Sequence, residues 1–340
     1  METKDSRLIV HQESPPNSET PIELLDAGLT PIPLFFTRNN FPPPAEIAPE
    51  AWRLEIDGEV ERGLSIGFAD LGKWPRKTVV SVLECTGNGR GRFEPIGGKA
   101  EGLPWGEGAV ANAEWQGVPV RHLLEEAGLR PSALQAECRG AGLVRGVEVE
   151  KLIADGLLAT EMNGRPLPHL HGGPVRLVVP GWGGINWIKW IESMTLLDHE
   201  SPSSFNQDGY VIWDKEGRDR GKATEMPIKS IFKSPRDGAS LRPGEIEIEG
   251  LAWSPGVPLE KVEISFDDGD SWEEAAFVGQ DRGPFSWREF RLRKNLLAGL
   301  YRLACRATDI QGKTQPPTVE WNKKGYLMNA WHRLAIAVTD

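Results

Sequence analysis

Apolar and polar residues alternate most regularly in the last third of the chain. Apolar and polar residues alternate in the segments EIEIEGLAW, KVEISFDDGDSW, SWREFRL and GLYRLACRATD, and turn-forming residues separate them. An alternation of period two with turns at this spacing predicts a β-sandwich of immunoglobulin-like architecture. The Asp-Gly-Asp sequence at 268–270 predicts a hairpin turn rather than a calcium loop, because the further acidic positions of an EF-hand are missing.

Earlier in the chain the pattern is less regular. Short apolar runs between Gly and Pro residues predict strands at 52–56, 78–83 and 175–179, and one run predicts a helix at 120–127. The segment PIPLFFTRNNFPPP predicts a fixed loop at an edge, because proline cannot donate a hydrogen bond to a sheet. We expect a mixed α and β domain with long irregular loops, where binding residues usually lie.

The expected fold class is therefore α+β, with two domains. A mixed α/β domain with an N-terminal arm is expected over residues 1–225, followed by an immunoglobulin-like β-sandwich over 226–340. A chain of 340 residues with 39% hydrophobic residues exceeds what one core usually organises. The change of pattern places the boundary within 222–233. Polar and proline-containing sequence up to about residue 30 predicts that the arm is loosely packed.

The charge balance limits the possible partners. The chain carries 39 basic and 49 acidic residues, a formal net charge of -10, which argues against a nucleic acid or an anionic membrane. Any bound anion must therefore meet a local basic pocket. No stretch approaches the roughly 20 apolar residues of a membrane span, and the N-terminus lacks the apolar core of a secretory signal. We expect a cytoplasmic protein, or a periplasmic one if an export leader has been removed.

Cysteine and histidine spacing gives little evidence for a disulfide framework or a metal site. Cys85, Cys138 and Cys305 form no CxxC pair, so disulfides are not expected. Of the six histidines, only His169 and His171 lie close together. In an extended segment both would point the same way, but without a third ligand hydrogen bonding in a loop is favoured over a metal site.

Cys85 stands out because of what surrounds it. It follows the apolar run TVVSVLE and precedes TGNGRGR, so a strand is expected to end there and present the thiol at a glycine-rich turn. Nearby Arg90 and Arg92 would favour the thiolate, the form that acts as a nucleophile or binds a soft metal. A lone cysteine is more often a small buried apolar residue, and this alternative stays open. The glycine run is not GxGxxG, and FEPIGGKAEGLPW is not expected to open a helix, so a dinucleotide site is not predicted.

Several segments resemble the sulfite oxidase family, in the same order along nearly the whole chain beyond the arm. They are FFTRNN, LECTGNGR, GLPWGEGAVANAEWQGVPV, ATEMNGRPLPHLHGGPVRLVVPGWGG with INWIKW, and WNKKGYLMNAWHR. The resemblance implies a molybdopterin-binding domain followed by an immunoglobulin-like dimerisation domain, in agreement with the division that periodicity predicts. It also implies a homodimer of the haem-free plant or bacterial type, since no part of the sequence offers a haem domain.

The resemblance implies that Cys85 binds molybdenum beside the two dithiolene sulfurs of molybdopterin. The cofactor-binding residues that it implies are Phe36, Thr37, Arg38, Asn39, Asn40, Cys85, His171, Arg176, Trp187, Ile188 and Lys189. Arginine and lysine are suited to the pterin phosphate. Without the resemblance, Arg176 would be taken as a surface charge at a strand edge. The chain departs from the family at Asn40, which replaces a frequent histidine, and at Gly142, where animal enzymes have an acidic contact.

The resemblance also implies a substrate pocket. Its residues would be Arg38, Arg90, Trp105, Tyr210 and Lys324. Lys324 replaces a family arginine, which keeps the charge but loses the bidentate fork. Without the resemblance, Tyr210 is about as well explained as a half-buried loop aromatic. The implied reaction is the oxidation of sulfite to sulfate with water as the oxygen source, and electrons pass to oxygen or to a cytochrome.

Three other functions stay open at this point. The same scaffold could act on nitrate, a sulfoxide or sulfane sulfur. A non-catalytic immunoglobulin-like binding protein would bury Cys85 and bind no metal. A Cys-His hydrolase would need a base near Cys85, and the sequence offers no recognisable partner motif.

Overall fold

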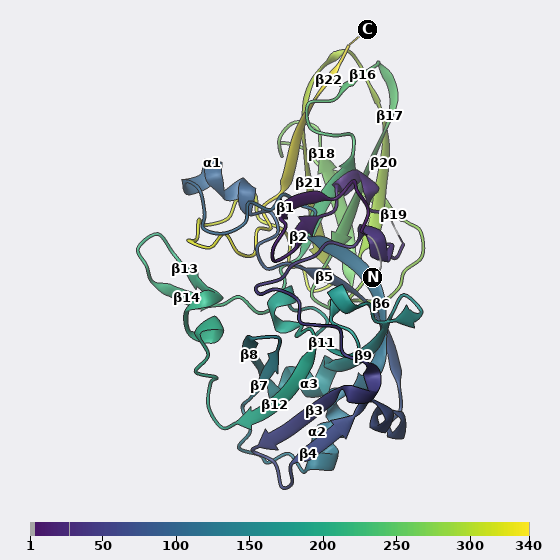
Figure 1. The fold of residues 1–340 in the computed structure, drawn as a ribbon. Helices are drawn as coiled ribbons and strands as arrows, with labels where there is room; N and C mark the ends of the chain where they lie inside the picture. Colours follow the sequence, from purple (N-terminus) through teal and green to yellow (C-terminus); the bar gives the residue numbers. More distant parts are fainter. Residues whose placement is uncertain (1–3, 27, 340) are drawn as a thin grey trace.

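The structure has two large apolar cores, one in each of two regions of the chain. It is a computed structural model and describes residues 4–26 and 28–339. The larger core is built from side chains between Ile32 and Leu196, and the second from side chains between Ile228 and Val338. In Figure 1 the strands of the second core extend away from the mixed α and β region that holds the first. The α+β class with a β-rich C-terminal domain is thus confirmed, while the boundary at residue 225 stays a prediction.

The first core lies between two five-stranded sheets and two helices. One sheet has the order β10-β9-β6-β5, with β11 also paired to β9, and the other has the order β4-β3-β12-β7-β8. Strands β3 and β12 run parallel, and the other pairs are antiparallel. The strands of the first sheet are β5 (Lys77–Glu84), β6 (Val110–Pro119), β9 (Leu157–Met162), β10 (Arg165–Pro166) and β11 (Arg176–Val178). Those of the second are β3 (Arg53–Gly58), β4 (Leu64–Gly67), β7 (Gln135–Gly140), β8 (Leu143–Glu148) and β12 (Ile191–Leu197).

The helices of this region are short. Helix α2 (Val120–Ala127) buries Val120, Leu123, Leu124 and Ala127, one face of a helical repeat, and ends at Gly128 in the left-handed conformation. The remaining helices and turns of helix are α1 (Glu94–Gly97), α3 (Val149–Asp155), the 3₁₀ turns Ile22–Leu24, Ile32–Leu34, Pro49–Ala51, Phe68–Lys73, Arg90–Phe93, His169–His171 and Gly184–Asn186, and a π turn at Phe205–Gly209.

The C-terminal strands form one continuous pairing path whose two halves face each other. The path runs β15-β17-β20-β19-β18-β21-β22-β16, and both halves contribute buried side chains to the second core. The strands are β15 (Lys229–Ser234), β16 (Ser240–Leu241), β17 (Gly244–Trp253), β18 (Leu259–Ser265), β19 (Glu273–Val278), β20 (Arg288–Leu296), β21 (Gly299–Asp309) and β22 (His332–Val338). Two hairpins lie outside these sheets, β1 (Ile9–Gln12) with β2 (Asn17–Glu19) and β13 (Val211–Trp213) with β14 (Asp219–Lys222).

The predicted elements of the first region are found close to their expected places. The helix covers 120–127 as predicted, and the strands predicted at 52–56, 78–83 and 175–179 correspond to β3, β5 and β11. One expectation is wrong in part, because FEPIGGKAEGLPW does open with a turn of α-helix at Glu94–Gly97, directly after a 3₁₀ turn at Arg90–Phe93; we call these the second and the first turn. Pro95 stands in the first turn of the second, where the missing N–H costs nothing.

The prediction of a loosely packed N-terminal arm is wrong. Asn17, Ser18, Glu19 and Thr20 are all buried, and the Ser18 backbone pairs with that of Thr37. Polar residues can be buried in this way when every polar group finds a partner. Some of those partners lie far along the chain, such as Gly106 and Gly108 for Glu19, so local composition could not reveal them.

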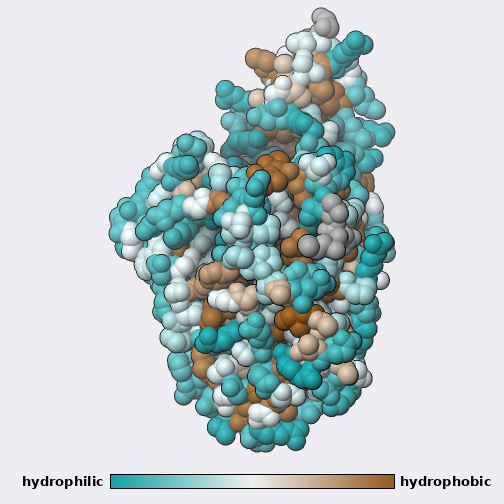
Figure 2. All heavy atoms as spheres, in the orientation of Figure 1, coloured by the Kyte–Doolittle hydropathy of each residue, from teal (hydrophilic) through white to brown (hydrophobic). Residues whose placement is uncertain are grey.

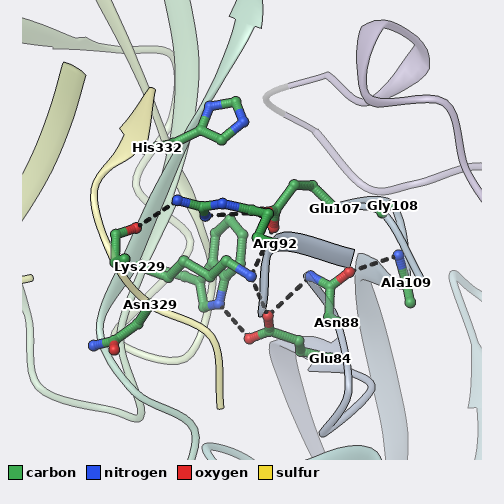
Figure 3. A network of polar contacts seen from close by, with 12 residues as sticks. Glu84, Asn88, Arg92, Glu107, Gly108, Ala109, Lys229, Asn329 and His332 are labelled. Atoms are coloured by element: carbon green, nitrogen blue, oxygen red, sulfur yellow. Dashed lines mark hydrogen bonds and ion pairs between the residues drawn. The ribbon is translucent and has the colours of Figure 1, made fainter. Parts of the chain in front are cut away.

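A buried network of charges joins the two regions (Figure 3). Lys229 Nζ of β15 is fully buried and lies 3.1 Å from Glu84 Oε1 and 2.8 Å from Glu107 Oε2. Arg92 Nη1 lies 2.9 Å from Glu107 Oε1. Burial opposes the ionisation of Glu107, but Lys229 and Arg92 hold its pKa well below its usual range. Two cations and two carboxylates therefore balance one another at this contact.

His332 lies beside this network, and its titration is expected to make stability depend on pH. Burial, with Arg92 and Lys229 nearby and Glu107 opposing them, lowers the pKa of His332 from 6.5 to about 4. Its Nδ1 also accepts a hydrogen bond from the Phe232 N–H, which protonation would disrupt. Between these pH values the unfolded chain binds a proton that the folded chain does not, so stability falls as the pH drops from 6.5 to 4.

Urea unfolding of the wild type and of His332→Gln measures this contribution. When the pH is lowered from about 7 to about 5, the free energy of unfolding of the variant should fall by about 1–2 kcal/mol less than that of the wild type. Equal losses in both proteins would show that His332 does not contribute to the acid sensitivity.

The surface carries scattered apolar residues. Figure 2 shows a largely hydrophilic face with separate hydrophobic patches. The most exposed large apolar side chains are Leu300 at 87% and Leu297 at 77%, where β20 turns into β21. In the part of the chain that the structure describes, no helix is long and apolar enough to cross a membrane.

Candidate functional site

Cys85 is held at the end of β5 by a turn that is fixed from both sides. Its N–H donates to the Ala109 carbonyl, and its carbonyl accepts from the Asn88 N–H, both at 2.8 Å. The Asn88 side chain donates to Glu84 Oε1 at 2.9 Å and accepts from the Ala109 N–H at 3.0 Å. Glu84 Oε2 in turn accepts from Trp253 Nε1 at 2.9 Å. The C-terminal domain therefore helps to fix the position of the thiol.

Two adjoining cavities meet at Cys85, which is 9% exposed. We name them the Arg176 cavity and the Lys324 cavity after one wall residue of each. Both are lined by Cys85, Arg38, Asn40 and Tyr210. Within residues 4–26 and 28–339, no group of three or more His, Cys, Asp or Glu side chains gathers to hold a metal. The placement of Cys85 favours a ligand role in a cavity over that of an inert core residue.

The Arg176 cavity brings together most of the predicted cofactor-binding residues. Those on its wall are Phe36, Thr37, Arg38, Asn39, Asn40, Cys85, His171, Arg176, Trp187 and Lys189. They come from the loop before β3, the end of β5, the turn before β11 with the first residue of that strand, and the segment before β12. Ile188 lines neither cavity; it is fully buried, and its carbonyl accepts from the Leu177 N–H at 2.8 Å.

Two cations without carboxylate partners, Arg176 buried and Lys189 partly buried, distinguish this cavity. Arg176 is 2% exposed and donates to the carbonyls of His171 at 2.9 Å and Trp187 at 3.2 Å, while its Nε is buried without a partner. Lys189 donates to Asn39 Oδ1. Among the described residues, no carboxylate forms an ion pair with Arg176 or Lys189. Because an unpaired buried charge is costly, this arrangement calls for a bound anion.

Burial also lowers the pKa values of the basic groups in this cavity. Burial lowers the pKa of Arg176 to about 9. Burial, with repulsion from Arg176, Lys4 and Arg38, lowers the pKa of Lys189 well below its usual range, and burial beside cations does the same for His171. A phosphate would reverse these effects by supplying negative charge and hydrogen-bond acceptors. The residues present therefore fit the phosphate of a molybdopterin.

Lys4 does not line this cavity but contacts His171, which does, and this role was not predicted. Its Nζ lies 2.7 Å from His171 Nε2 and donates to the carbonyls of Ile32 at 2.9 Å and Phe35 at 2.8 Å. It comes from the N-terminal arm, which the sequence assigned no role. No local signal could have found it, because its partner His171 is 167 residues away.

The Lys324 cavity combines three cations. Arg38, Arg90 and Lys324 all line it, which suits a small dianion. Arg90 is 8% exposed and donates through Nε to the Lys324 carbonyl at 2.7 Å and through Nη1 to the Leu103 carbonyl at 2.6 Å. Arg38 donates through Nη2 to Asn40 Oδ1 at 2.6 Å. Both guanidinium groups are thus oriented by the protein before any ligand arrives.

Tyr210 is held by a second tyrosine that the sequence analysis missed. Its ring stacks on that of Tyr326, with centroids 5.1 Å apart and an angle of 5° between the planes. The Tyr326 hydroxyl donates to the Gly209 carbonyl at 2.8 Å, and the Arg145 guanidinium lies 5.8 Å from the Tyr210 ring centre. Burial raises the pKa of Tyr326, so this hydroxyl stays protonated. Tyr326 lies inside WNKKGYLMNAWHR, one of the segments that resemble the family, and this position was the sequence feature that could have identified it.

Several residues do not lie where the sequence placed them. Trp105 is fully buried, packs edge-on against His11 at 4.8 Å and lines neither cavity. Arg92 was expected to act on the thiol, but its guanidinium binds Glu107. His169, by contrast, makes the loop hydrogen bond that was favoured for it, since its Nε2 lies 3.0 Å from the Pro44 carbonyl.

Two family models together match most of the chain. Residues 40–205 match the oxidoreductase molybdopterin binding domain, and residues 220–339 match the Mo-co oxidoreductase dimerisation domain. The chain is 37% identical to the sulfite oxidase of Gallus gallus, over 96% of this chain and 77% of that protein. It is 28% identical to the sulfite oxidase of Arabidopsis thaliana, over 97% of this chain and 93% of that protein.

A solved structure extends the likeness to the whole fold. The crystal structure of the sulfane dehydrogenase SoxCD from Paracoccus pantotrophus matches with a TM-score of 0.87 and 30% identity. The match covers 97% of this chain and 88% of that chain. Two domain models match, and one relative is 37% identical over 96% of this chain, so the chain belongs to the sulfite oxidase family of molybdopterin oxidoreductases.

Proposed function

We propose that this protein oxidises sulfite to sulfate with a molybdenum cofactor that is bound through Cys85. One observation carries the proposal: Cys85 lies on the wall shared by a cavity whose cations Arg176 and Lys189 have no carboxylate partner and a second basic cavity. The first fits the phosphate of molybdopterin, held by His171, Arg176 and Lys189. When bound, the cofactor supplies two-electron exchange and oxygen transfer.

The protein's own part is to bind and orient the anion. Arg38, Arg90 and Lys324 attract sulfite in spite of the net charge of -10. Arg38 and Arg90 already donate to protein oxygens, so their charges are placed without reorganisation on binding. The stack with Tyr326 fixes the Tyr210 ring, and the Tyr210 hydroxyl is the group we assign to hydrogen bonding at the reacting oxygen.

Metal analysis of the purified protein, together with pterin fluorescence after release, tests the cofactor. Sulfite-dependent reduction of an artificial electron acceptor tests the reaction, and thiosulfate, nitrate and a sulfoxide are compared in parallel. We expect molybdenum and pterin in equal amounts and turnover with sulfite. Protein that contains both but turns over only another of these compounds would overturn the assignment of sulfite.

Arg38→Gln is expected to weaken sulfite binding more than binding of an uncharged compound. A charge-assisted hydrogen bond contributes about 1.5–3 kcal/mol, so KM for sulfite should rise about 10- to 100-fold. KM for a neutral sulfoxide, measured in the reductive direction, should change little. Arg62→Gln is a matched control, since Arg62 is 65% exposed and pairs only loosely with Glu126. Equal changes for both compounds in Arg38→Gln would contradict an anion pocket.

We further propose a homodimer formed through the C-terminal domain. Residues 220–339 match a dimerisation domain, and the exposed side chains of Leu297 and Leu300 project from that domain. Sedimentation of the purified protein tests this, and a monomer at micromolar concentration would contradict it. Oxygen or a cytochrome as electron acceptor, and a cytoplasmic location, stay proposals that rest on the sequence.

A further inference from the structure

One carboxylate lies among the cations of the Lys324 cavity. Of the described residues that line this cavity, Glu101 alone is acidic. Its Oε2 accepts from Lys324 Nζ at 2.9 Å, and its Oε1 lies 3.5 Å from Lys323 Nζ. The side chains of Glu101 and Lys324 are 53% and 25% exposed, so the pair stands at the rim. A cavity suited to an anion therefore contains a group that opposes one.

The backbone brings these two side chains together. The Glu101 N–H donates to the Lys323 carbonyl at 2.8 Å, which joins the loop before residue 103 to the segment after residue 320. Arg90 strengthens the junction, since it donates to the carbonyls of both Leu103 and Lys324.

Two glycines permit this close approach of Arg90. A Cβ on Gly102, which has a φ of +113°, would lie 2.8 Å from Arg90 Nη1. A Cβ on Gly325, which has a φ of +58°, would lie 2.7 Å from Arg90 Cγ. The Glu101–Lys324 pair is consequently pre-arranged by two anchored segments, unlike a chance meeting of two flexible surface side chains.

The charge on Glu101 has a direct consequence for an entering anion. The hydrogen bond from Lys324 keeps the Glu101 carboxyl ionised by lowering its pKa. An oxyanion that binds Lys324 must replace this carboxylate or share the ammonium with it. The same carboxylate repels any dianion across the cavity. Both effects weaken the binding of substrate and product alike.

We propose that Glu101 limits the affinity of the oxyanion pocket for dianions by holding Lys324. The identity of the anion as sulfite or sulfate rests on the proposed function. By weakening sulfate as well as sulfite, Glu101 favours release of the product. If its role were only structural, Glu101 would link the two segments and its charge would have no effect on anion affinity.

Glu101→Gln tests the proposal in the holoenzyme. The variant keeps the side-chain size and can still accept a hydrogen bond from Lys324, but it loses the charge. We expect KM for sulfite and the inhibition constant of sulfate each to fall about 2- to 10-fold, from the strength of a well-placed surface pair. Titration calorimetry with sulfate should show the same gain. Unchanged or weaker anion binding would overturn the proposal.

A double-mutant cycle with Lys324→Gln separates action through Lys324 from general repulsion. If Glu101 acts by holding Lys324, then Glu101→Gln should gain much less affinity when Lys324 is already replaced. An equal gain in both backgrounds would overturn that part of the mechanism. Glu23→Gln is the matched control, because it removes one negative charge from an exposed pair with Arg236. It should leave anion affinity unchanged.

The calorimetry also keeps this inference distinct from the proposed function. Sulfate binding does not depend on turnover, so a protein that fails to oxidise sulfite still reports whether Glu101 limits oxyanion affinity. Turnover with sulfite and an unchanged sulfate affinity in Glu101→Gln would refute the inference alone.

Discussion

Cys85→Ser is expected to reduce sulfite oxidation to less than about one-thousandth of the wild-type rate, a loss of ~4 kcal/mol of transition-state stabilisation. A serine hydroxyl keeps the size of the side chain but stays protonated, so it cannot replace a thiolate as a ligand for a soft metal. The turn around residue 85 depends on backbone groups and on Asn88, so the fold should persist. Steady-state turnover and the molybdenum content of the variant measure the effect.

Cys138→Ala is the control for this experiment. Cys138 is also a free and fully buried thiol, but it lies in β7 and lines neither cavity. Burial raises its pKa, which keeps it an inert thiol. The control should lose about 1 kcal/mol of stability and keep its activity. Wild-type turnover in Cys85→Ser, at the same melting temperature, would refute the metal-ligand role.

Lys229→Met is expected to lower the free energy of unfolding by about 3–5 kcal/mol. The substitution keeps an apolar chain of similar length but removes the ammonium that lies within 3.1 Å of both Glu84 and Glu107. Arg92 remains as a partner of Glu107, whereas Glu84 keeps only neutral donors. A buried carboxylate without a counterion either destabilises the folded state, because it has lost its hydration, or takes up a proton. Urea unfolding monitored by tryptophan fluorescence measures the loss.

Lys313→Met provides the comparison. Lys313 is 55% exposed and lies 3.7 Å from Glu225, so its removal should cost less than about 1 kcal/mol. If Lys229→Met lost no more stability than this control, the network in Figure 3 would not hold the two regions together. Because Glu84 immediately precedes Cys85, molybdenum content should also be followed in Lys229→Met. A lower content would show that the C-terminal domain supports the cofactor site.

Elements with a strong local pattern were predictable. Helix α2 has its buried residues on one face and a glycine at its end, and the structure places it at the predicted residues. The strand before Cys85 was predictable because an apolar run meets a glycine-rich turn, and the alternating segments after residue 240 form the predicted sandwich. Hydrophobic periodicity is a local property, so it can be read without knowing the fold.

The site was predictable to the extent that short segments carry it. Cys85, Arg38, His171, Arg176 and Tyr210 lie on the cavity walls as the resemblance implied. Trp105 and Ile188 belong to the same segments but do not line a cavity. Neighbouring residues in a segment can point in opposite directions, so the segment does not settle which side chain reaches a ligand.

The sequence by itself determined the α+β class, the division into a mixed domain and a sandwich, and the family, because these depend on periodicity and on contiguous motifs. The tertiary structure decided the roles of Lys4, Glu101, Lys229 and Tyr326. Each acts through a partner more than 80 residues away, such as Lys4 on His171 and Glu101 on Lys324. A charge in a sequence is only a residue type. Its effect depends on burial and on the opposite charge that it meets, and both exist only in the folded chain.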